Sequence, residues 1–251
     1  MLRLLPANMP EARINSSYAL WQRVIEEYTK GALTCASDKL VALSAIAKEF
    51  QQLTGDTYLA GLGRGNLLYG LCWWAEPVFN RTSSSSGRED YHAPSWSWAS
   101  VDGIVWYLPE FHGLAVDTTL VAQIQDAKTA LASSNPTGQV TGGYIRITGN
   151  IGLINVSKEN QRADRYTKYD LDGQQVKFLI YLDHLLLQED KQHMYCIPLL
   201  RCLSGRDPIY GLLLELVRGE DGVYRRVGIF QAGSKEADCF NNIPEQEITI
   251  V

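Results

Sequence analysis

The chain has 251 residues, 45% of them hydrophobic and 20% charged, which is typical of a globular protein. A net charge of −5 at pH 7 argues against nucleic acid and anionic membrane surfaces as partners, because both attract basic proteins. No apolar run is long enough to span a membrane, and the opening MLRLLPANMP lacks the sustained apolar core of a signal peptide. Five scattered cysteines without a CxxC pair favour reduced thiols, so we expect a cytoplasmic protein.

The first part of the chain, residues 1–78, has the periodicity of a helical layer. Apolar residues recur at spacings of three and four between Trp21 and Lys30, which predicts an amphipathic helix. A second helix is predicted over residues 37–53, with an apolar stripe at Leu40, Leu43, Ile46, Ala47, Phe50 and Leu53. A third is predicted to begin after Gly65 and to end before Pro77.

After the helices, the hydrophobic period changes to two residues. Residues 80–90 (NRTSSSSGRED) are polar and serine-rich, and we interpret them as an exposed, mobile loop. Strands are predicted at 95–101, 104–108, 144–154, 175–184, 193–203, 209–217 and 223–230, and a loop at 127–138. The order of elements predicts one α+β domain over residues 1–251. In it, N-terminal helices pack on a mostly antiparallel sheet, sandwich or partly closed barrel formed by residues 93–233.

One stretch, APSWSWASVDG at residues 93–103, alternates two tryptophans with serines ahead of an Asp-Gly pair. Asp-Gly between β-prone runs predicts a two-residue hairpin turn. In that hairpin Trp98 would oppose Tyr107, and one face would carry Trp96, Trp98, Val105 and Tyr107. Trp106 would lie on the opposite face. Either face could be core or could line an apolar ligand site.

Six segments of the sequence, in this order, carry a resemblance to a known protein family: WQRVIEEYTKGALTCASDKLVALSAIAKEF, GDTYLAGL, YHAPSWSWASVDG, MYCIPLL, YGLLLEL and YRRVGIF. Together, from Trp21 to Phe230, they resemble the region that follows the HET (heterokaryon incompatibility) domain in fungal proteins. The resemblance implies a freestanding relative of that region. The HET domain itself, a TIR-like α/β unit, is not in this sequence, so we do not expect this chain alone to signal incompatibility.

Two positions depart from the pattern of that family. It usually has tryptophan where this sequence has Gly63, and glycine where it has Ala45. The loss of a large indole at position 63 could open space for a pocket, or neighbouring side chains could repack into it. The family offers no catalytic residues that could be carried over.

Motifs for catalysis are not found in the sequence. It has no GxSxG, HExxH, P-loop or paired-carboxylate motif, and its four histidines are dispersed, so we predict neither a metal nor another cofactor.

The sequence is therefore compatible with two functions. In the first, the chain is a cofactor-independent cyclase or isomerase of fungal secondary metabolism, such as an intramolecular Diels–Alderase, and binds an apolar terpenoid or polyketide. The candidate catalytic residues are Trp96, Trp98, Tyr107 and His92, and the candidate substrate-binding residues are Trp106, Trp73, Tyr69 and Val105. In the alternative, the chain is a non-enzymatic module that binds a ligand or a protein, and the same tryptophans are core. No oligomeric state is predicted.

Overall fold

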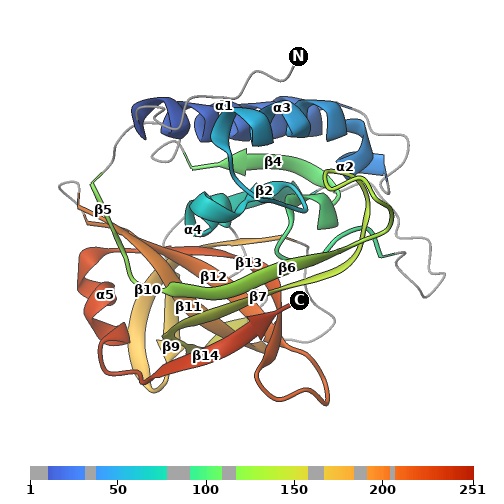
Figure 1. The fold of residues 1–251 in the computed structure, drawn as a ribbon. Coiled ribbons are helices and arrows are strands. Elements are labelled where there is room, and N and C mark those ends of the chain that lie inside the picture. Colours follow the sequence, from blue (N-terminus) through green and yellow to red (C-terminus); the bar gives the residue numbers. More distant parts are fainter. Residues whose placement is uncertain are drawn as a thin grey trace.

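A helical layer lies over a β-barrel in the computed structural model, which describes residues 11–31, 38–77, 91–108, 117–157, 167–183, 191–203 and 207–251 (Figure 1). The expected α+β class and the partly closed barrel are confirmed. Within the described ranges, no helix combines the length and the apolar character needed to cross a membrane. The predicted mobile loop at 80–90 lies outside the described residues.

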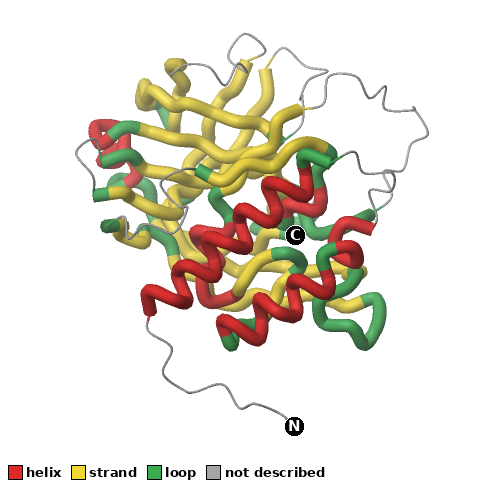
Figure 2. The backbone as a smooth tube through the Cα atoms, turned by 90° about the horizontal axis from the view of Figure 1, so that it is seen from above, coloured by secondary structure: helices red, strands yellow, loops and turns green. Residues whose placement is uncertain are grey.

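The helical layer consists of α1 (Glu11–Thr29), α2 (Lys39–Ala42) and α3 (Ser44–Thr54), seen from above in Figure 2. Trp21 of α1 is buried and stacks on Phe50 of α3 at a centroid distance of 5.2 Å. The second predicted helix is interrupted at Leu43, between α2 and α3. The apolar stripe expected there was wrong for Ile46 and Leu53, whose side chains are exposed on the outer face.

The third predicted helix is only a short turn. Residues Arg64–Asn66 form the 3-10 helix η2, Leu67–Gly70 form α4, and the chain then becomes the strand β3 (Trp73–Pro77). Trp73 is fully buried whereas Trp74 is half-buried, so the two indoles point to opposite sides as in a strand. β3 pairs with β4 (Gly103–Tyr107) in a two-stranded ribbon, and this pairing replaces the expected helix.

Six antiparallel strands close into the barrel. They are β8 (Gly152–Ser157), β9 (Thr167–Leu171), β10 (Gln174–Leu182), β11 (Lys191–Cys202), β12 (Ile209–Leu216) and β13 (Val223–Ala232). The order is β10-β9-β8-β11-β12-β13, and β10 pairs with β13 to close the ring. Inside, Phe178 stacks on Phe230 at 4.7 Å and on Phe240 at 6.1 Å, the last from α5 (Ser234–Phe240). Side chains therefore fill the barrel interior.

The sheet continues beyond the barrel. β13 also pairs, in parallel, with β14 (Glu245–Ile250), which is followed by β7 (Val140–Asn150) and the edge strand β6 (Gln123–Leu131). A short strand, β5 (Thr118–Leu120), pairs with β11. The strand expected at 144–154 is in fact two strands, β7 and β8. The prediction of a loop at 127–138 was wrong for its first residues, which belong to β6. β6 buries only Ala127, so its sequence lacks the apolar alternation that predicts a strand.

The outer edge of β6 carries a charged cluster around Asp126. Arg64 Nη1 donates to the carbonyl oxygen of Ala127 at 2.5 Å, so the arginine covers the middle of this strand edge. The Asp126 carboxylate accepts from the Tyr144 hydroxyl at 2.8 Å and lies 3.6 Å from Arg146 Nη2 and 3.7 Å from Lys128 Nζ. The Tyr144 hydrogen bond, the backbone N–H of Ala127 and nearby cations lower the pKa of Asp126 to about 2.

The low pKa of Asp126 predicts acid-sensitive stability. The pKa in the folded state lies below the unfolded value of about 3.9, so the ionised carboxylate stabilises the fold above about pH 4, and this contribution is lost as the pH falls toward 2. Tyr144→Phe removes the largest cause of the shift and should flatten the pH dependence of stability between about pH 4 and 2. Urea midpoints at a series of pH values measure this slope. A slope identical to that of the wild type would contradict the assignment.

Candidate functional site

The stretch APSWSWASVDG does not form a β-hairpin. Residues Trp98–Ser100 are a 3-10 helix, η3, and the Ser97 hydroxyl caps it by accepting from the backbone N–H of Ala99 at 3.1 Å. The Ser100 hydroxyl donates to the Ser97 carbonyl at 2.7 Å. Such local serine bonds compete with strand pairing. The predicted pairing of Trp98 with Tyr107 was therefore wrong: Tyr107 lies opposite Trp73 instead.

This loop, residues 93–102 and here called the tryptophan loop, is bonded to α2 and to the turn between the short strands β1 (Tyr58–Leu59) and β2 (Leu62–Gly63). The Ser97 hydroxyl donates to the Ala60 carbonyl at 2.6 Å, and Trp98 Nε1 donates to the Gly61 carbonyl at 3.2 Å. The buried Lys39 ammonium donates to the Val101 carbonyl and lies 2.9 Å from Asp102 Oδ1. These contacts hold the loop against α2 and the turn at Gly61.

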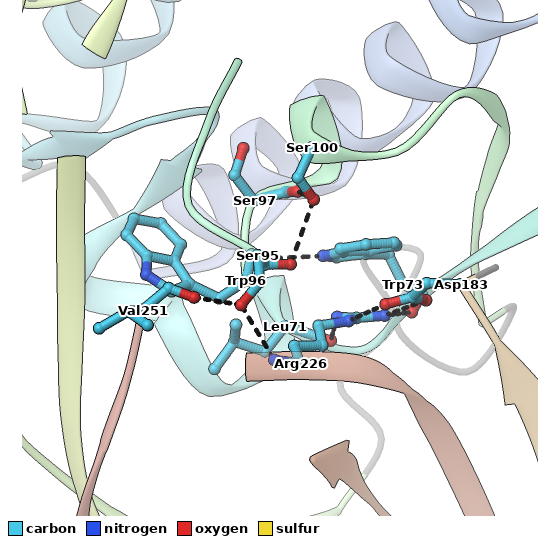
Figure 3. Close-up of polar contacts among 9 residues, drawn as sticks. All are labelled: Leu71, Trp73, Ser95, Trp96, Ser97, Ser100, Asp183, Arg226 and Val251. Carbon is cyan, nitrogen blue, oxygen red and sulfur yellow. Dashed lines mark hydrogen bonds and ion pairs between the residues drawn. The ribbon is translucent and has the colours of Figure 1, made fainter. Parts of the chain in front are cut away.

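On its other side, the tryptophan loop is bonded to the barrel and its extension (Figure 3). The backbone N–H of Ser95 donates to the main-chain oxygen of Val251 at 3.1 Å, and the Ser95 hydroxyl donates to the same atom. The Ser95 hydroxyl also accepts from the backbone N–H of Arg226 at 2.9 Å. Trp73 Nε1 donates to the Trp96 carbonyl at 3.3 Å, which ties the loop to the ribbon.

Arg226 makes the central contact in Figure 3. Its wholly buried guanidinium binds the Asp183 carboxylate through two nitrogens, at 2.8 and 3.2 Å. It also donates to the carbonyl of Leu71 at 2.6 Å and to that of Trp73, and its Cζ lies 3.3 Å from the Trp73 ring centroid. One side chain of the barrel thus satisfies the first carbonyl of β3 and another just before the strand.

The other edge of the ribbon is covered by α1. The buried Glu26 carboxylate accepts from the backbone N–H of Tyr107 at 2.8 Å, and the Thr29 hydroxyl accepts from that of Val105 at 3.0 Å. Helix side chains here take the place of a third strand. Together with Arg226, they fix the ribbon between the helical layer and the barrel.

Most of the predicted site residues lie in the core. Trp73, Trp96, Trp98, Val105 and Tyr107 belong to one buried cluster, each with at most 3% of its surface exposed. Trp73, Val105 and Tyr107 share one face of the ribbon, as the register requires. Burial raises the pKa of the Tyr107 hydroxyl well above its usual range, which keeps it protonated.

The remaining candidates are more accessible. Tyr69 is half-buried, and its hydroxyl is bonded to that of Thr118 on β5. His92 is half-buried, and its Nδ1 is covered without a hydrogen-bond partner among the described residues. Trp106 is half-buried on the outer face of the ribbon. These three residues come from α4, the loop before Trp96 and β4 respectively.

The outer face of the ribbon is the strongest candidate site. Trp106 lies beside Trp74 with ring centroids 6.3 Å apart and planes 25° apart, and Trp74 lies 4.9 Å from Tyr181 of β10 at 32°. All three rings are half-buried, and we call them the aromatic row. Lys30 Nζ, from the end of α1, lies 4.8 Å from the Trp106 ring centroid. Helix, ribbon and barrel each contribute side chains to this surface.

Two members of the aromatic row, Trp74 and Tyr181, were not among the site residues predicted from the sequence. The signal for Trp74 is the doublet of tryptophans: adjacent residues on a strand point to opposite sides, so one buried indole implies one on the outer face. Tyr181 had no such signal, because only the tertiary fold brings β10 beside β3.

Among the described residues, one ammonium and two carboxylates lie near the row. Lys30 Nζ is paired with the Glu27 carboxylate at 2.6 Å, and Glu76 lies on the same face of β3 as Trp74, with its side chain exposed. Trp106 Nε1 is covered and has no acceptor within the described part of the chain. In contrast, the indole nitrogens of Trp21, Trp73 and Trp98 each donate to a carbonyl. The row is thus a flat apolar surface, and the Trp106 N–H beside it is covered by protein atoms.

A metal site is not found in the described ranges, where no three His, Cys, Asp or Glu side chains gather. Cys72, Cys196 and Cys202 are buried thiols without disulfides. Burial raises the pKa of Cys72 and Cys196 far above the usual thiol range, so neither is a nucleophile at neutral pH.

Gly63 does not open a pocket. It is buried, and a Cβ built on it would lie 2.7 Å from Asp56 Oδ2 and 2.7 Å from Tyr18 Cε1. The Tyr18 hydroxyl donates to the same Asp56 atom at 2.6 Å, and the Tyr18 ring packs edge-on against Phe50. Repacking by Tyr18 therefore fills the space that the absent indole could have left, and the pocket hypothesis at this position was wrong.

This close packing predicts the effect of a methyl group. Gly63→Ala should lower the free energy of unfolding by about 1–3 kcal/mol, because Tyr18 and Asp56 must move to admit the new atom. In a Tyr18→Ala background the same change should cost less. Denaturant unfolding of the four proteins in this cycle measures both costs, and equal costs in the two backgrounds would contradict the packing argument.

Comparison with known protein families, with curated proteins and with solved structures gave no match to this chain. Membership of the HET-related family stays a prediction that rests on the motifs quoted above.

Proposed function

We propose that the chain binds a flat, apolar small molecule across the aromatic row of Trp106, Trp74 and Tyr181. The observation that supports this most is the row itself. Its three rings are half-buried at one surface, and the planes of neighbouring rings are 25° apart for Trp106 and Trp74 and 32° apart for Trp74 and Tyr181. Aromatic faces favour stacked, conjugated ligands. Because the ribbon is fixed on both edges, the row is preorganised before a ligand arrives.

The chemistry that we propose on this surface is a cofactor-independent cyclisation or isomerisation, such as an intramolecular Diels–Alder reaction of a terpenoid or polyketide. Such a reaction is accelerated when a flexible chain is held in one reactive conformation. A flat wall of rings restricts the conformations of a polyene and so raises the share of the reactive one. The tryptophan loop supports the rings of the ribbon from behind.

A tethered substrate tests this proposal. The probe is a linear compound that carries a conjugated diene and an α,β-unsaturated ketone joined by a short saturated tether. With wild-type protein we expect faster cyclisation than in buffer and an excess of one diastereomer. The double variant Trp74→Ala/Trp106→Ala should lose both effects, whereas Tyr195→Ala, which removes a half-buried ring on β11, should keep them. Equal rates and product ratios with and without protein would contradict the enzyme.

A second candidate function is a non-enzymatic binding module related to the HET proteins. The observation that favours it is the burial of Trp73, Trp96 and Trp98, which pack as scaffold. In this case the aromatic row would bind the same ligands without turnover. Quenching of tryptophan fluorescence by the probe, with unchanged cyclisation rates, would support the module.

We also propose that the protein acts in the cytoplasm. The buried, reduced thiols of Cys72 and Cys196 support a reducing compartment. Microscopy of the fluorescently tagged chain in a fungal host tests this, and its recovery from the culture medium would contradict it.

A further inference from the structure

The outer face of the helical layer carries several exposed apolar side chains. Among the described residues, nine large apolar side chains are exposed, and four of these lie in α1–α3: Leu20, Val41, Ile46 and Leu53. Each of the four has between 45% and 59% of its surface exposed. Figure 2 looks onto this face, and α1 and α3 lie in front of the sheets there. Exposed apolar side chains that gather on one face of a protein indicate a contact surface.

The helices α1 and α3 run in opposite directions. The Thr29 hydroxyl, at the end of α1, accepts from the backbone N–H of Val105. The Lys39 ammonium, at the start of α2, donates to the carbonyl of Val101, four residues earlier in the same segment. The start of α3 therefore lies beside the end of α1, and the two helices are antiparallel neighbours.

The apolar side chains follow the line along which α1 and α3 meet. Trp21 of α1 stacks on Phe50 of α3 across this line. On α3, two of the side chains are four residues before and three residues after Phe50; on α1, one is three residues after Trp21 and the other lies one turn before it. Residues three or four positions apart share one side of a helix, so each pair leans toward the other helix. We call these four side chains the outer stripe: Leu20, Val24, Ile46 and Leu53.

Each helix places one exposed charge beside the outer stripe at the same level. Arg23 is two residues beyond Trp21, and Glu49 is one residue before Phe50 on the antiparallel helix, so the two differ by about 2 Å along the helix axes at about 1.5 Å per residue. Neither forms an ion pair with a described residue. Lys48, two positions before Phe50, lies on the side of α3 remote from α1.

We infer that the outer stripe is the contact surface for a second copy of this chain. A two-fold axis parallel to the helices places α1 of each copy on α3 of the other, so stripe packs on stripe. In this arrangement Arg23 of each copy comes level with Glu49 of the partner copy. One face thus carries both halves of a reciprocal contact, with apolar side chains at its centre and an opposite charge pair on either side. The inference does not depend on the proposed function.

The size of the face predicts a weak, reversible dimer. From Ser16 to Lys30, the exposed part of α1 is about 22 Å long, and two helices side by side are about 20 Å wide. A contact of this size buries roughly 800 Å² in total, which is below the area of a standard stable interface. We therefore expect a dissociation constant of about 10–100 μM for the dimer.

Analytical ultracentrifugation over a range of protein concentrations tests this inference. The average mass of the wild type should rise from monomer toward dimer as the concentration passes the dissociation constant. Ile46→Glu buries a carboxylate twice in the symmetric contact and should weaken the dimer at least about tenfold. The matched control is Leu120→Glu, the same kind of change at an exposed leucine of β5, which should leave the dissociation constant unchanged.

A charge exchange tests how the two copies are arranged. Arg23→Glu places like charges together at two symmetric positions and should weaken the dimer about tenfold, whereas Arg23→Glu/Glu49→Arg should restore it to within about threefold of the wild type. A wild type that stays monomeric at every concentration would overturn the inference, and so would a dimer that Ile46→Glu does not weaken. If the double variant dimerises no better than Arg23→Glu alone, the two charges are not partners and the proposed arrangement is wrong.

Discussion

Arg226→Met should lower the free energy of unfolding by about 3–5 kcal/mol. The substitution leaves the Asp183 carboxylate buried without its partner, and it removes the donors to the carbonyls of Leu71 and Trp73. A buried carboxylate without a counter-charge is far more costly than the loss of an exposed pair. Denaturant unfolding monitored by circular dichroism measures the change.

The neighbouring Arg225 provides the matched control. It lies on the same strand but is exposed, so Arg225→Met should change stability by no more than about 0.5 kcal/mol. Arg226→Lys should be little more stable than Arg226→Met. An ammonium cannot bind the carboxylate through two nitrogens and stack on Trp73 as well.

A double variant distinguishes the unpaired charge from lost packing. Asp183→Leu/Arg226→Met should be more stable than Arg226→Met alone, because it removes the uncompensated carboxylate. If the double variant is less stable than the single one, the main cost of losing Arg226 is packing and the lost carbonyl contacts. Equal stability of Arg226→Met and Arg225→Met would contradict the central role of the buried pair.

Trp98→Ala should lower the free energy of unfolding by about 3–5 kcal/mol, as for other fully buried aromatic residues. The ring packs edge-on against Tyr28 at 6.1 Å, and its Nε1 donates to the Gly61 carbonyl. Gly61 has φ of +99° and lies so close to the indole that a Cβ on it would be 2.2 Å from Trp98 Nε1. The indole and this glycine are therefore fitted to each other, and truncation leaves a cavity between the loop and the helices.

Trp106→Ala is the control for the aromatic row. Trp106 is only half-buried, so its truncation should cost about 1–2 kcal/mol, since only part of its surface is removed from water on folding. We expect Trp106→Ala to impair binding of the tethered probe while the protein stays folded. If instead Trp98→Ala keeps wild-type stability and loses binding of the tethered probe, Trp98 is a ligand-binding residue and its description as core is wrong.

The fold was predictable where hydrophobic period alone decides the structure. Strands such as β12 and β13 have alternating or continuous apolar residues and lie between Asp-Pro and Asp-Gly turns. The residues at which they begin and end are close to those predicted. The second half of helix α1 was recognised from the spacing of Trp21, Ile25 and Tyr28, whereas its first half, from Glu11, was missed. β9 and β14 were missed because each is short and buries only two residues on one face.

The candidate site was harder to predict because tertiary partners override local signals there. Asp102-Gly103 favours a hairpin, but Trp73-Trp74 supplies a better partner for β4 from about thirty residues upstream. Serine hydroxyls then fold residues 97–100 into a turn. The sequence correctly placed Val105 and Tyr107 on one face and Trp106 on the other, since that depends only on strand alternation. It could not indicate which face would be open.

The bond between Ser95 and Val251 has a consequence for the order of folding. The two residues are 156 positions apart, and β14 enters the sheet between β13 and β7, which are themselves far apart in the chain. Contacts of such long sequence separation form slowly, because a large loop must close before they stabilise anything. During synthesis the helices and the tryptophan loop emerge well before the strand that completes their support. We therefore expect the tryptophan loop, although made early, to be among the last parts of the molecule to become ordered.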